Sequence, residues 1–406
     1  MSLNTVNYSG KKVVVGLTGR VASCVTALLL KKQGMNVIGL TIVTNSNDNF
    51  AEKSSYPTCH VEDLDKIKVF CEDLKIPFYA TDGKSQFDSE VMDPLISNKL
   101  SGMANVSCFN CTKLRLDILY HKMKEIKADY FATGHFCKVQ KNLTTNDFYI
   151  HSNNDVDSDQ AYLLAGIDNK YLKHLLLPIG ELKTSEVDKI AEKYQLATLP
   201  NREATGFCFR DKESYMNAAK ARIPKSMKRD GQVYNVDTDL IHGDHDGIIS
   251  HYVTEPGTIF KGVNTNDKDL QIVGYDFVKA RILIGGSANL SGKGIQAIDL
   301  QLSSGLDMKK PIHCFIKSKY SKEYVKVNLY FKNNNSALLE LDAELYPLIE
   351  GEYIVIFDKN SRNAKVVGLG KIGKIGEFEL VDRVDEFKST ESIESSSQKA
   401  SRLFKF

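Results

Sequence analysis

The chain has 406 residues, of which 42% are hydrophobic and 26% are charged, and it contains no tryptophan. This composition is typical of a globular protein, and the length predicts two or three domains rather than one. The formal net charge of +2 is too small to indicate a nucleic-acid partner by itself.

The first half of the chain alternates short apolar runs with amphipathic segments. Strands are expected at 13–17, 37–42, 76–80 and 130–133, and helices at 22–33, 63–74 and 111–126. Strands rich in β-branched residues that alternate with helices predict a mostly parallel, doubly wound sheet, so the fold class is α/β. Residues 1–150 are assigned to this domain, which is of nucleotide-binding type.

The rest of the chain changes character twice. An amphipathic helix is expected at 184–194, with Thr184 or Ser185 as its N-cap, so residues 151–230 are predicted to be helical. From residue 231 the pattern predicts short strands at 232–236, 247–253, 271–275, 280–284, 312–317, 324–331, 353–357 and 365–369. This spacing predicts β-barrel modules over 231–380. The serine-rich, charged segment 381–406 predicts a disordered tail.

The eight cysteines are too sparse for a disulfide scaffold; they occupy positions 24, 59, 71, 108, 111, 137, 208 and 314. No secretory signal or membrane-spanning run is visible, so we expect no membrane partner and a reducing compartment, the cytoplasm or alternatively the mitochondrion. In such a compartment a Cys-x-x-Cys pair more often indicates redox, metal or catalytic chemistry than a structural role. A monomer is the default expectation.

The turn between the first strand and its helix is a candidate phosphate site. It consists of Gly16, Leu17, Thr18, Gly19, Arg20, Val21, Ala22 and Ser23. Backbone N–H groups and the positive end of the helix could bind phosphate there. It is not a Walker loop, because no Gly-Lys-Ser/Thr sequence closes it. A plain strand-to-helix turn is an equally good interpretation.

The pair Cys108 and Cys111 begins a helix, where the helix dipole together with Lys113 and Arg115 would favour a thiolate. A complete four-cysteine zinc site is excluded, because no second Cys-x-x-Cys exists. The alternative is a pair of buried structural cysteines. Cys208 lies between two phenylalanines and precedes an arginine, which is a weak signal by itself.

Two further polar side chains are placed where ligands are common. His135 follows the expected strand at 130–133, and ligands bind at the carboxyl ends of strands in open α/β sheets. A lone histidine there is nevertheless more often structural or next to a ligand than a base. Asp159 opens an apolar helix, where the N-cap interpretation is strong.

Taken in order, these segments resemble the tRNA-specific 2-thiouridylases, enzymes that place sulfur at position 2 of the wobble uridine. The resemblance runs collinearly from residue 12 to residue 374. It is carried by Gly-Leu-Thr-Gly at 16–19, Ala-Asp-Tyr-Phe-Ala-Thr-Gly-His at 128–135, Asp-Gln-Ala-Tyr at 159–162, Leu-Pro-Ile-Gly-Glu-Leu at 177–182, Gly-Phe-Cys-Phe at 206–209 and His-Asp-Gly at 245–247.

The resemblance implies an N-terminal PP-loop ATPase-type domain, a central tRNA-binding region and a C-terminal β-barrel. It implies ATP and Mg²⁺, adenylation of the uridine O2, and delivery of sulfur from a persulfide on Cys208, which a sulfur-donor protein loads. Cys111 would assist release and could form a disulfide with Cys208. This division of roles suits thiol exchange, which needs a nearby resolving thiol.

The same resemblance assigns binding residues. ATP would be held by the turn 16–23, by Ile42 and by Gly134. The target base would meet Val106, Ser107 and Cys108, and the tRNA would also contact Ser158, Asp159, Gln160, Lys319 and Tyr320.

The chain departs from the family pattern at the turn. The family reads Ser-Gly-Gly-Val-Asp-Ser, whereas Arg20 here replaces a glycine and Ala22 replaces a carboxylate. A working sulfurtransferase is the preferred hypothesis. One alternative is a non-catalytic tRNA-binding relative with a degraded ATP site. The other is a variant in which Cys108, Cys111 and Cys208 hold an iron–sulfur cluster.

Overall fold

The computed structural model of the chain describes residues 8–44, 64–104, 106–196, 222–223, 230–248, 251–260, 268–303, 306, 310–318, 323–377 and 388–389. The chain forms two compact units. Unit 1 comprises Met1–Met92, Ser107–Ser214 and Asp358–Val367; unit 2 comprises Asp93–Val106, Tyr215–Phe357 and Gly368–Phe406. Each unit therefore gathers segments that are far apart in the sequence.

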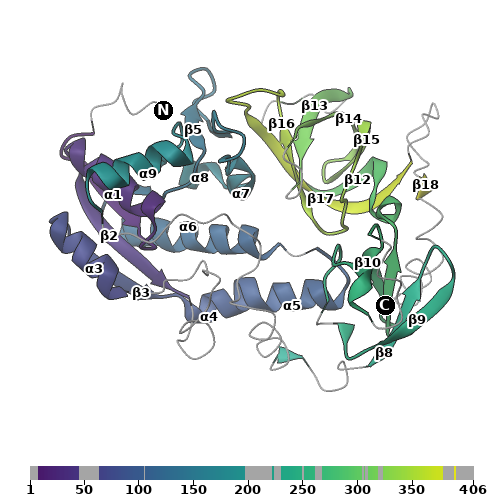
Figure 1. Ribbon diagram of the computed structural model, residues 1–406. Helices are drawn as coiled ribbons and strands as arrows, with labels where there is room; N and C mark the ends of the chain where they lie inside the picture. Colours follow the sequence, from purple (N-terminus) through teal and green to yellow (C-terminus); the bar gives the residue numbers. More distant parts are fainter. Residues whose placement is uncertain are drawn as a thin grey trace. The chain divides into compact units, whose positions relative to one another are not determined.

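Unit 1 is built on a five-stranded parallel sheet (Figure 1). Its order is β3-β2-β1-β4-β7, with bounds Phe78–Asp82, Asn36–Val43, Lys12–Gly16, Tyr130–Ala132 and Leu175–Leu176. The chain runs from β1 outward to β3 and then returns to place β4 on the other side of β1. Ligands in such sheets bind at this reversal, beyond the carboxyl ends of the strands.

Helices and one hairpin complete unit 1. They are α1 (Val21–Lys32), α3 (Leu64–Asp73), α4 (Lys84–Phe87), the π-helix η1 (Asp88–Met92), α6 (Ser107–Glu125), α7 (Ala161–Leu164), α8 (Asn169–Leu172), α9 (Thr184–Lys193) and the hairpin β5–β6 (Lys138–Lys141, Phe148–His151). Helices α1 and α9 pack side by side (Figure 1). The fully buried β1 side chains Val13 and Val15 share a core with Cys24 and Leu30 of α1. The predicted α/β fold class is confirmed.

Unit 2 contains a closed antiparallel barrel. Its strands in order are β12 (Gly292–Leu302), β15 (Ser336–Leu345), β14 (Val325–Asn333), β13 (Ile312–Lys317), β16 (Tyr353–Phe357) and β17 (Val366–Glu377). Pairing of β12 with β17 closes the ring, so these strands have no exposed edge. The short β18 (Lys388–Ser389) pairs with the end of β17. The predicted barrel architecture is confirmed.

A second sheet and a helix also belong to unit 2. The sheet has the order β10-β11-β8-β9, with bounds Gln271–Asp276, Arg281–Gly285, Gly231–Asn235 and Leu240–His245. Helix α5 spans Asp93–Leu100, and the short 3-10 helices η4 and η5 span Gly257–Ile259 and Ser287–Leu290.

Two local predictions are wrong. The described part of 247–253 forms no strand; Ile248 instead packs onto the core of the four-stranded sheet, and β9 lies earlier, at Leu240–His245. The N-cap of α9 is Lys183, whose backbone N–H donates to the Glu186 carboxylate at 2.8 Å. Thr184 is the first residue of the helix and not its N-cap, and its hydroxyl lies 2.9 Å from the Ser158 hydroxyl.

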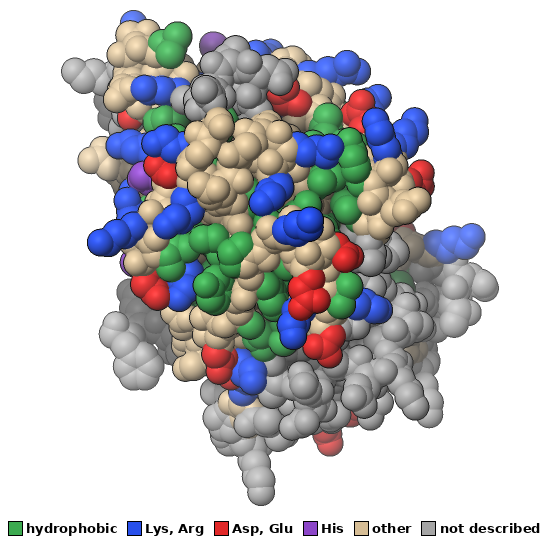
Figure 2. Space-filling view, turned by 90° about the vertical axis from the view of Figure 1, so that its left-hand side faces the viewer, with side chains coloured by type: hydrophobic (Ala, Val, Ile, Leu, Met, Phe, Trp, Pro, Cys, Tyr) green, Lys and Arg blue, Asp and Glu red, His purple; other side chains and the backbone are tan. Residues whose placement is uncertain are grey.

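Figure 2 shows how charged side chains are distributed over one face of the molecule. On the face drawn in Figure 2, basic side chains lie among acidic and apolar ones. This mixing agrees with the near-neutral charge of the whole sequence. Within the described residues, no helix is both long enough and apolar enough to cross a membrane.

Candidate nucleotide and thiol site

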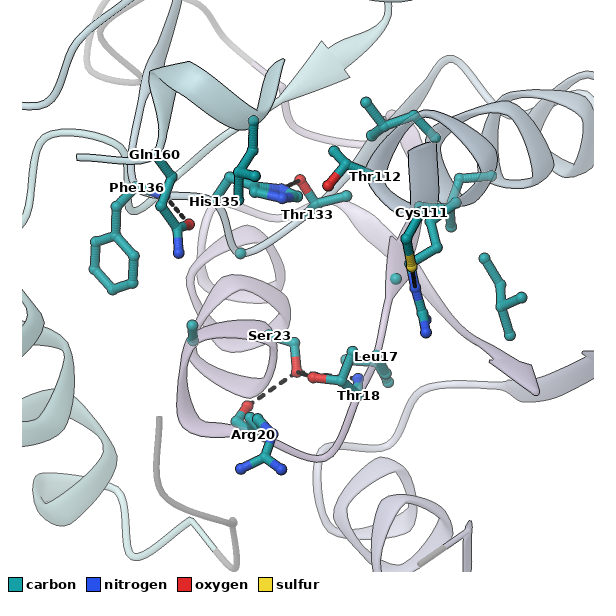
Figure 3. A pocket seen from close by; sticks show the side chains of 18 of the residues that line it. Leu17, Thr18, Arg20, Ser23, Cys111, Thr112, Thr133, His135, Phe136 and Gln160 are labelled. Atoms are coloured by element: carbon teal, nitrogen blue, oxygen red, sulfur yellow. Dashed lines mark hydrogen bonds between the residues drawn. The ribbon is translucent and has the colours of Figure 1, made fainter. Parts of the chain in front are cut away.

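Unit 1 contains a cavity of about 240 Å³ at the carboxyl ends of β1, β2 and β4 (Figure 3). It is lined by Gly16, Leu17, Thr18, Arg20, Ala22, Ser23, Leu40, Ile42, Cys108, Cys111, Thr112, Arg115, Leu116, Leu119, Thr133, Gly134, His135, Phe136, Gln160 and Leu163. Thr18, Arg20 and Ser23 lie on one side of the view, and His135 and Gln160 lie opposite them. The cavity is therefore at the switch point of the sheet.

The turn after β1 is held closed by its own side chains. The Ser23 hydroxyl accepts a hydrogen bond from the Thr18 N–H at 3.2 Å and donates one to the Arg20 carbonyl at 2.9 Å. Gly19 has φ of +77°, a left-handed conformation that favours glycine. Arg20 is the N-cap residue of α1, so the positive end of that helix meets the cavity.

Gly134 touches the backbone of this turn. A Cβ added at Gly134 would lie 2.8 Å from the Ala22 carbonyl carbon and 2.9 Å from the Ser23 nitrogen. The loop after β4 therefore packs directly against the first turn of α1. Only glycine allows this approach without a shift of the backbone.

Cys108 and Cys111 line the cavity from the first five residues of α6. The helix begins at Ser107 rather than at Cys111 as predicted, so both cysteines are helical. Its start is held by the ring of Phe109, which packs edge-on against Tyr162 at 6.0 Å between centroids. The sequence pattern alone could not reveal that contact, because Tyr162 lies more than 50 residues later in the chain.

Arg115 lies one turn after Cys111 on the same face of α6. Its Nε donates to the Cys111 Sγ at 3.2 Å, and its Nη2 donates to the Thr44 hydroxyl at 3.1 Å. Thr44 directly follows β2 and is buried. The guanidinium thus joins the cysteine to the end of a sheet strand.

His135 is neutral at physiological pH. Burial and, secondly, the positive charge of Arg115 lower the pKa of the imidazole to about 4. Its Nδ1 lies 2.8 Å from the Thr133 hydroxyl, so the ring is held in one orientation. A neutral imidazole at this position can donate or accept one hydrogen bond toward a ligand but carries no charge.

The depressed pKa of His135 predicts a stability that depends on pH. The pKa of histidine in an unfolded chain is near 6.5. The stabilisation of the folded state by neutral His135 is therefore fully present above that pH and is lost as the pH falls toward 4. Between pH 7 and pH 5 the expected loss is about 2 kcal/mol. Urea unfolding of wild type and His135→Gln at both pH values measures it. The control is His121→Gln at an exposed position, which should lose as much free energy of unfolding between pH 7 and pH 5 as wild type does. If His135→Gln also loses the wild-type amount, the pH dependence does not come from His135.

The structure gathers most, but not all, of the residues expected at the site. The cavity is lined by the turn residues except Gly19 and Val21, and by Ile42, Gly134, Cys108, Cys111 and Gln160. Gln160 Oε1 also accepts the Phe136 N–H at 3.1 Å. Cys208, Lys319 and Tyr320 lie outside the described residues.

The remaining expected residues lie away from the cavity lining. Val106 and Ser107 are buried at the start of α6. The Asp159 carboxylate accepts the N–H groups of Asn153 at 2.9 Å and Ala161 at 3.2 Å. Ser158 donates to the Asp155 carboxylate at 2.9 Å. These groups shape the loop before α7.

One wall of the cavity was predicted only in part: Cys108, Cys111 and Arg115 were singled out from the sequence, whereas Thr112, Leu116 and Leu119 were not. That wall is a single face of α6: Cys108, Cys111, Thr112, Arg115, Leu116 and Leu119. Its spacing of three and four residues is a helical signal, so a search for the neighbours of the two cysteines on a helix would have found the rest of it.

The donor set of the cavity suits a nucleotide better than a protein-bound metal ion. Arg20, the hydroxyls of Thr18 and Ser23 and the start of α1 can all contact phosphate oxygens. None of the described lining residues is an aspartate or glutamate. Among the described residues there is also no group of three potential metal ligands. Mg²⁺ prefers carboxylate and phosphate oxygens, so these side chains do not form a magnesium site of their own.

Comparisons with known proteins found a matching family model and several relatives of similar length. Residues 11–212 match the family model described as the tRNA methyl transferase HUP domain. The tRNA-specific 2-thiouridylase MnmA of Clostridioides difficile (strain 630) is 28% identical, covering 86% of this chain and 96% of the relative. Those of Lacticaseibacillus paracasei and Geobacillus kaustophilus are 27% and 26% identical, covering 88% and 86% of this chain and 94% and 93% of their own lengths. The similarity therefore extends over both units.

Proposed function

Because the chain belongs to the family of the tRNA-specific 2-thiouridylases, we propose that it transfers sulfur to position 2 of a tRNA uridine in an ATP-dependent reaction. The observation that carries the proposal is one cavity lined both by the turn between β1 and α1 and by Cys111. An activating nucleotide and a sulfur-handling thiol would meet there.

The proposed chemistry has three steps. ATP transfers its AMP group to the uridine O2 and releases pyrophosphate, which makes the oxygen a leaving group. The terminal sulfur of a persulfide on Cys208 attacks C2, and AMP departs with the oxygen. The Cys111 sulfur then attacks the Cys208 sulfur and breaks its bond to the transferred sulfur. The products are 2-thiouridine and a Cys111–Cys208 disulfide, which an external thiol reductant reopens.

The residues that bind ATP, the target base and the tRNA have separate roles in this proposal. The turn 16–23, Ile42 and Gly134 bind ATP, and the guanidinium of Arg20 offsets the phosphate charge. Val106, Ser107 and Cys108 meet the target base. The tRNA also contacts Ser158, Asp159, Gln160, Lys319 and Tyr320. A separate protein loads Cys208 with persulfide sulfur, and the enzyme acts as a cytoplasmic monomer.

The decisive test uses unmodified tRNA, ATP and a persulfide donor. AMP release together with 2-thiouridine, identified by mass spectrometry of the digested tRNA, supports the proposal. No AMP above background with intact tRNA binding would instead identify a non-catalytic tRNA-binding relative. A methylated nucleoside would point to the chemistry named by the family model. A visible absorption band after anaerobic purification that disappears in Cys108→Ala would identify the iron–sulfur variant.

The donor set also predicts how ATP binding responds to metal removal. Because guanidinium groups rather than carboxylates lie in the described lining, ATP affinity should fall less than about tenfold when EDTA replaces Mg²⁺. Arg20→Met should weaken binding in both conditions and more strongly in EDTA. Isothermal titration calorimetry measures both effects. Complete loss of wild-type binding in EDTA contradicts this prediction.

A further inference from the structure

Arg115 makes a connection that the proposed chemistry does not by itself require. One guanidinium contacts Cys111 on α6 and Thr44 at the end of β2, with donor–acceptor distances of 3.2 and 3.1 Å. The two partners are 67 residues apart in the sequence. The planar guanidinium presents its N–H groups in a fixed fork, so binding Thr44 fixes the direction in which Nε points at the sulfur.

We propose that Arg115 is a positioning residue, which holds the Cys111 sulfur in the cavity by fastening it to the end of β2 through Thr44. The proposal deepens the assigned function and rests on it for the role of Cys111. Thiol exchange requires the attacking sulfur to approach along the axis of the S–S bond, so a sulfur held in one place reacts faster than one that rotates about its Cα–Cβ bond. Arg115 itself neither gives nor takes a proton.

The electrostatics of the cavity give the proposal a second signature. The charge of Arg115 is, after burial, the other cause that lowers the pKa of His135 to about 4. The same guanidinium therefore acts on two cavity groups by different means. A hydrogen bond acts on Cys111, and a through-space charge acts on His135. Substitutions that keep the charge but lose the fork separate the two effects.

Four full-length variants test the proposal. Arg115→Met loses both the charge and the fork, whereas Arg115→Lys keeps only the charge. Thr44→Val removes the anchor and leaves the arginine in place. Lys122→Met is the matched control, because it removes a cation of the same helix that pairs with Glu125 and does not line the cavity.

The expected results differ for each variant. In Arg115→Met, turnover to 2-thiouridine should fall roughly tenfold or more with an unchanged KM for tRNA, and the His135 pKa should rise. In Arg115→Lys turnover should fall similarly while the His135 pKa stays low. Thr44→Val should show an intermediate loss, and Lys122→Met should match wild type. Nuclear magnetic resonance of labelled histidine reads the pKa.

Failure of the proposal is distinguishable from failure of the assigned function. Alkylation of Cys111 by iodoacetamide, located by tandem mass spectrometry, needs neither ATP nor tRNA. If wild type makes no 2-thiouridine, the function is wrong, yet a changed alkylation rate in Arg115→Lys and Thr44→Val still supports the positioning role. Alkylation rates in Arg115→Met and Thr44→Val equal to the wild-type rate overturn it.

Discussion

Replacement of either proposed sulfur-handling cysteine is expected to abolish thiolation while leaving the first chemical step intact. Cys208→Ser cannot carry a persulfide, and Cys111→Ser cannot open the disulfide that links the transferred sulfur to the protein, because a hydroxyl does not exchange with S–S bonds. Formation of 2-thiouridine should fall by roughly 1,000-fold or more in each variant. Pyrophosphate release over a single turnover should persist in both variants, whereas AMP should leave the tRNA only in Cys111→Ser.

The control for this experiment is a cysteine of unit 2. Cys314 is buried in the barrel strand β13, where burial raises the pKa of its thiol to about 12. Such a thiol is protonated and unreactive near neutral pH. Cys314→Ala should therefore keep thiolation activity, with at most a lower stability. Thiolation by Cys111→Ser at the wild-type rate excludes its resolving role.

A methyl group added at Gly134 is expected to damage the nucleotide site. In Gly134→Ala the new Cβ would lie 2.8 Å from the Ala22 carbonyl carbon and 2.9 Å from the Ser23 nitrogen. These are backbone atoms at the start of α1, so the loop or the helix must move. ATP affinity should fall at least about tenfold, and overpacking should lower the free energy of unfolding by about 1–3 kcal/mol. Calorimetric titration and urea unfolding measure the two effects.

Gly274 supplies the matched control. A Cβ at this position in β10 would meet only the Leu283 Cδ1, at 3.6 Å, which is ordinary van der Waals contact. Gly274→Ala should therefore leave ATP binding unchanged. If Gly134→Ala binds ATP like wild type and unfolds at the same urea concentration, the close packing of the loop on α1 does not matter for the site.

Much of unit 1 is predictable from local sequence. The strands at 13–17 and 37–42 and the helix at 22–33 agree with β1, β2 and α1 to within one residue at each end. Buried parallel strands are continuous apolar runs, and Gly34, with φ of +80°, marks the end of the helix. These signals are local, so no knowledge of the fold is needed to use them.

Other predictions failed because tertiary contacts override local preference. The apolar residues of 247–253 correctly predict burial, but burial of Ile248 comes from packing on a core and not from strand pairing. Conversely, β9 begins with the exposed residues Leu240 and Ile241, so it lacks the alternation of a half-buried strand. The long barrel strands β12 and β15 were also not predicted from the sequence. Their pairing across the closed ring defines them.

Several features of the site could be read from the sequence alone: the small-residue turn after the first strand, the cysteine pair at a helix start, and the histidine that follows a strand end. The order of the motifs along the chain also determined the family resemblance, because that order can be recognised without knowledge of the fold. Only the tertiary structure decided that these features share one cavity, that Gly134 rests on Ala22, and that Arg115 joins Cys111 to Thr44. The physical reason is that parallel strands bring their carboxyl ends together whatever their separation along the chain, and no local pattern records which side chains then meet.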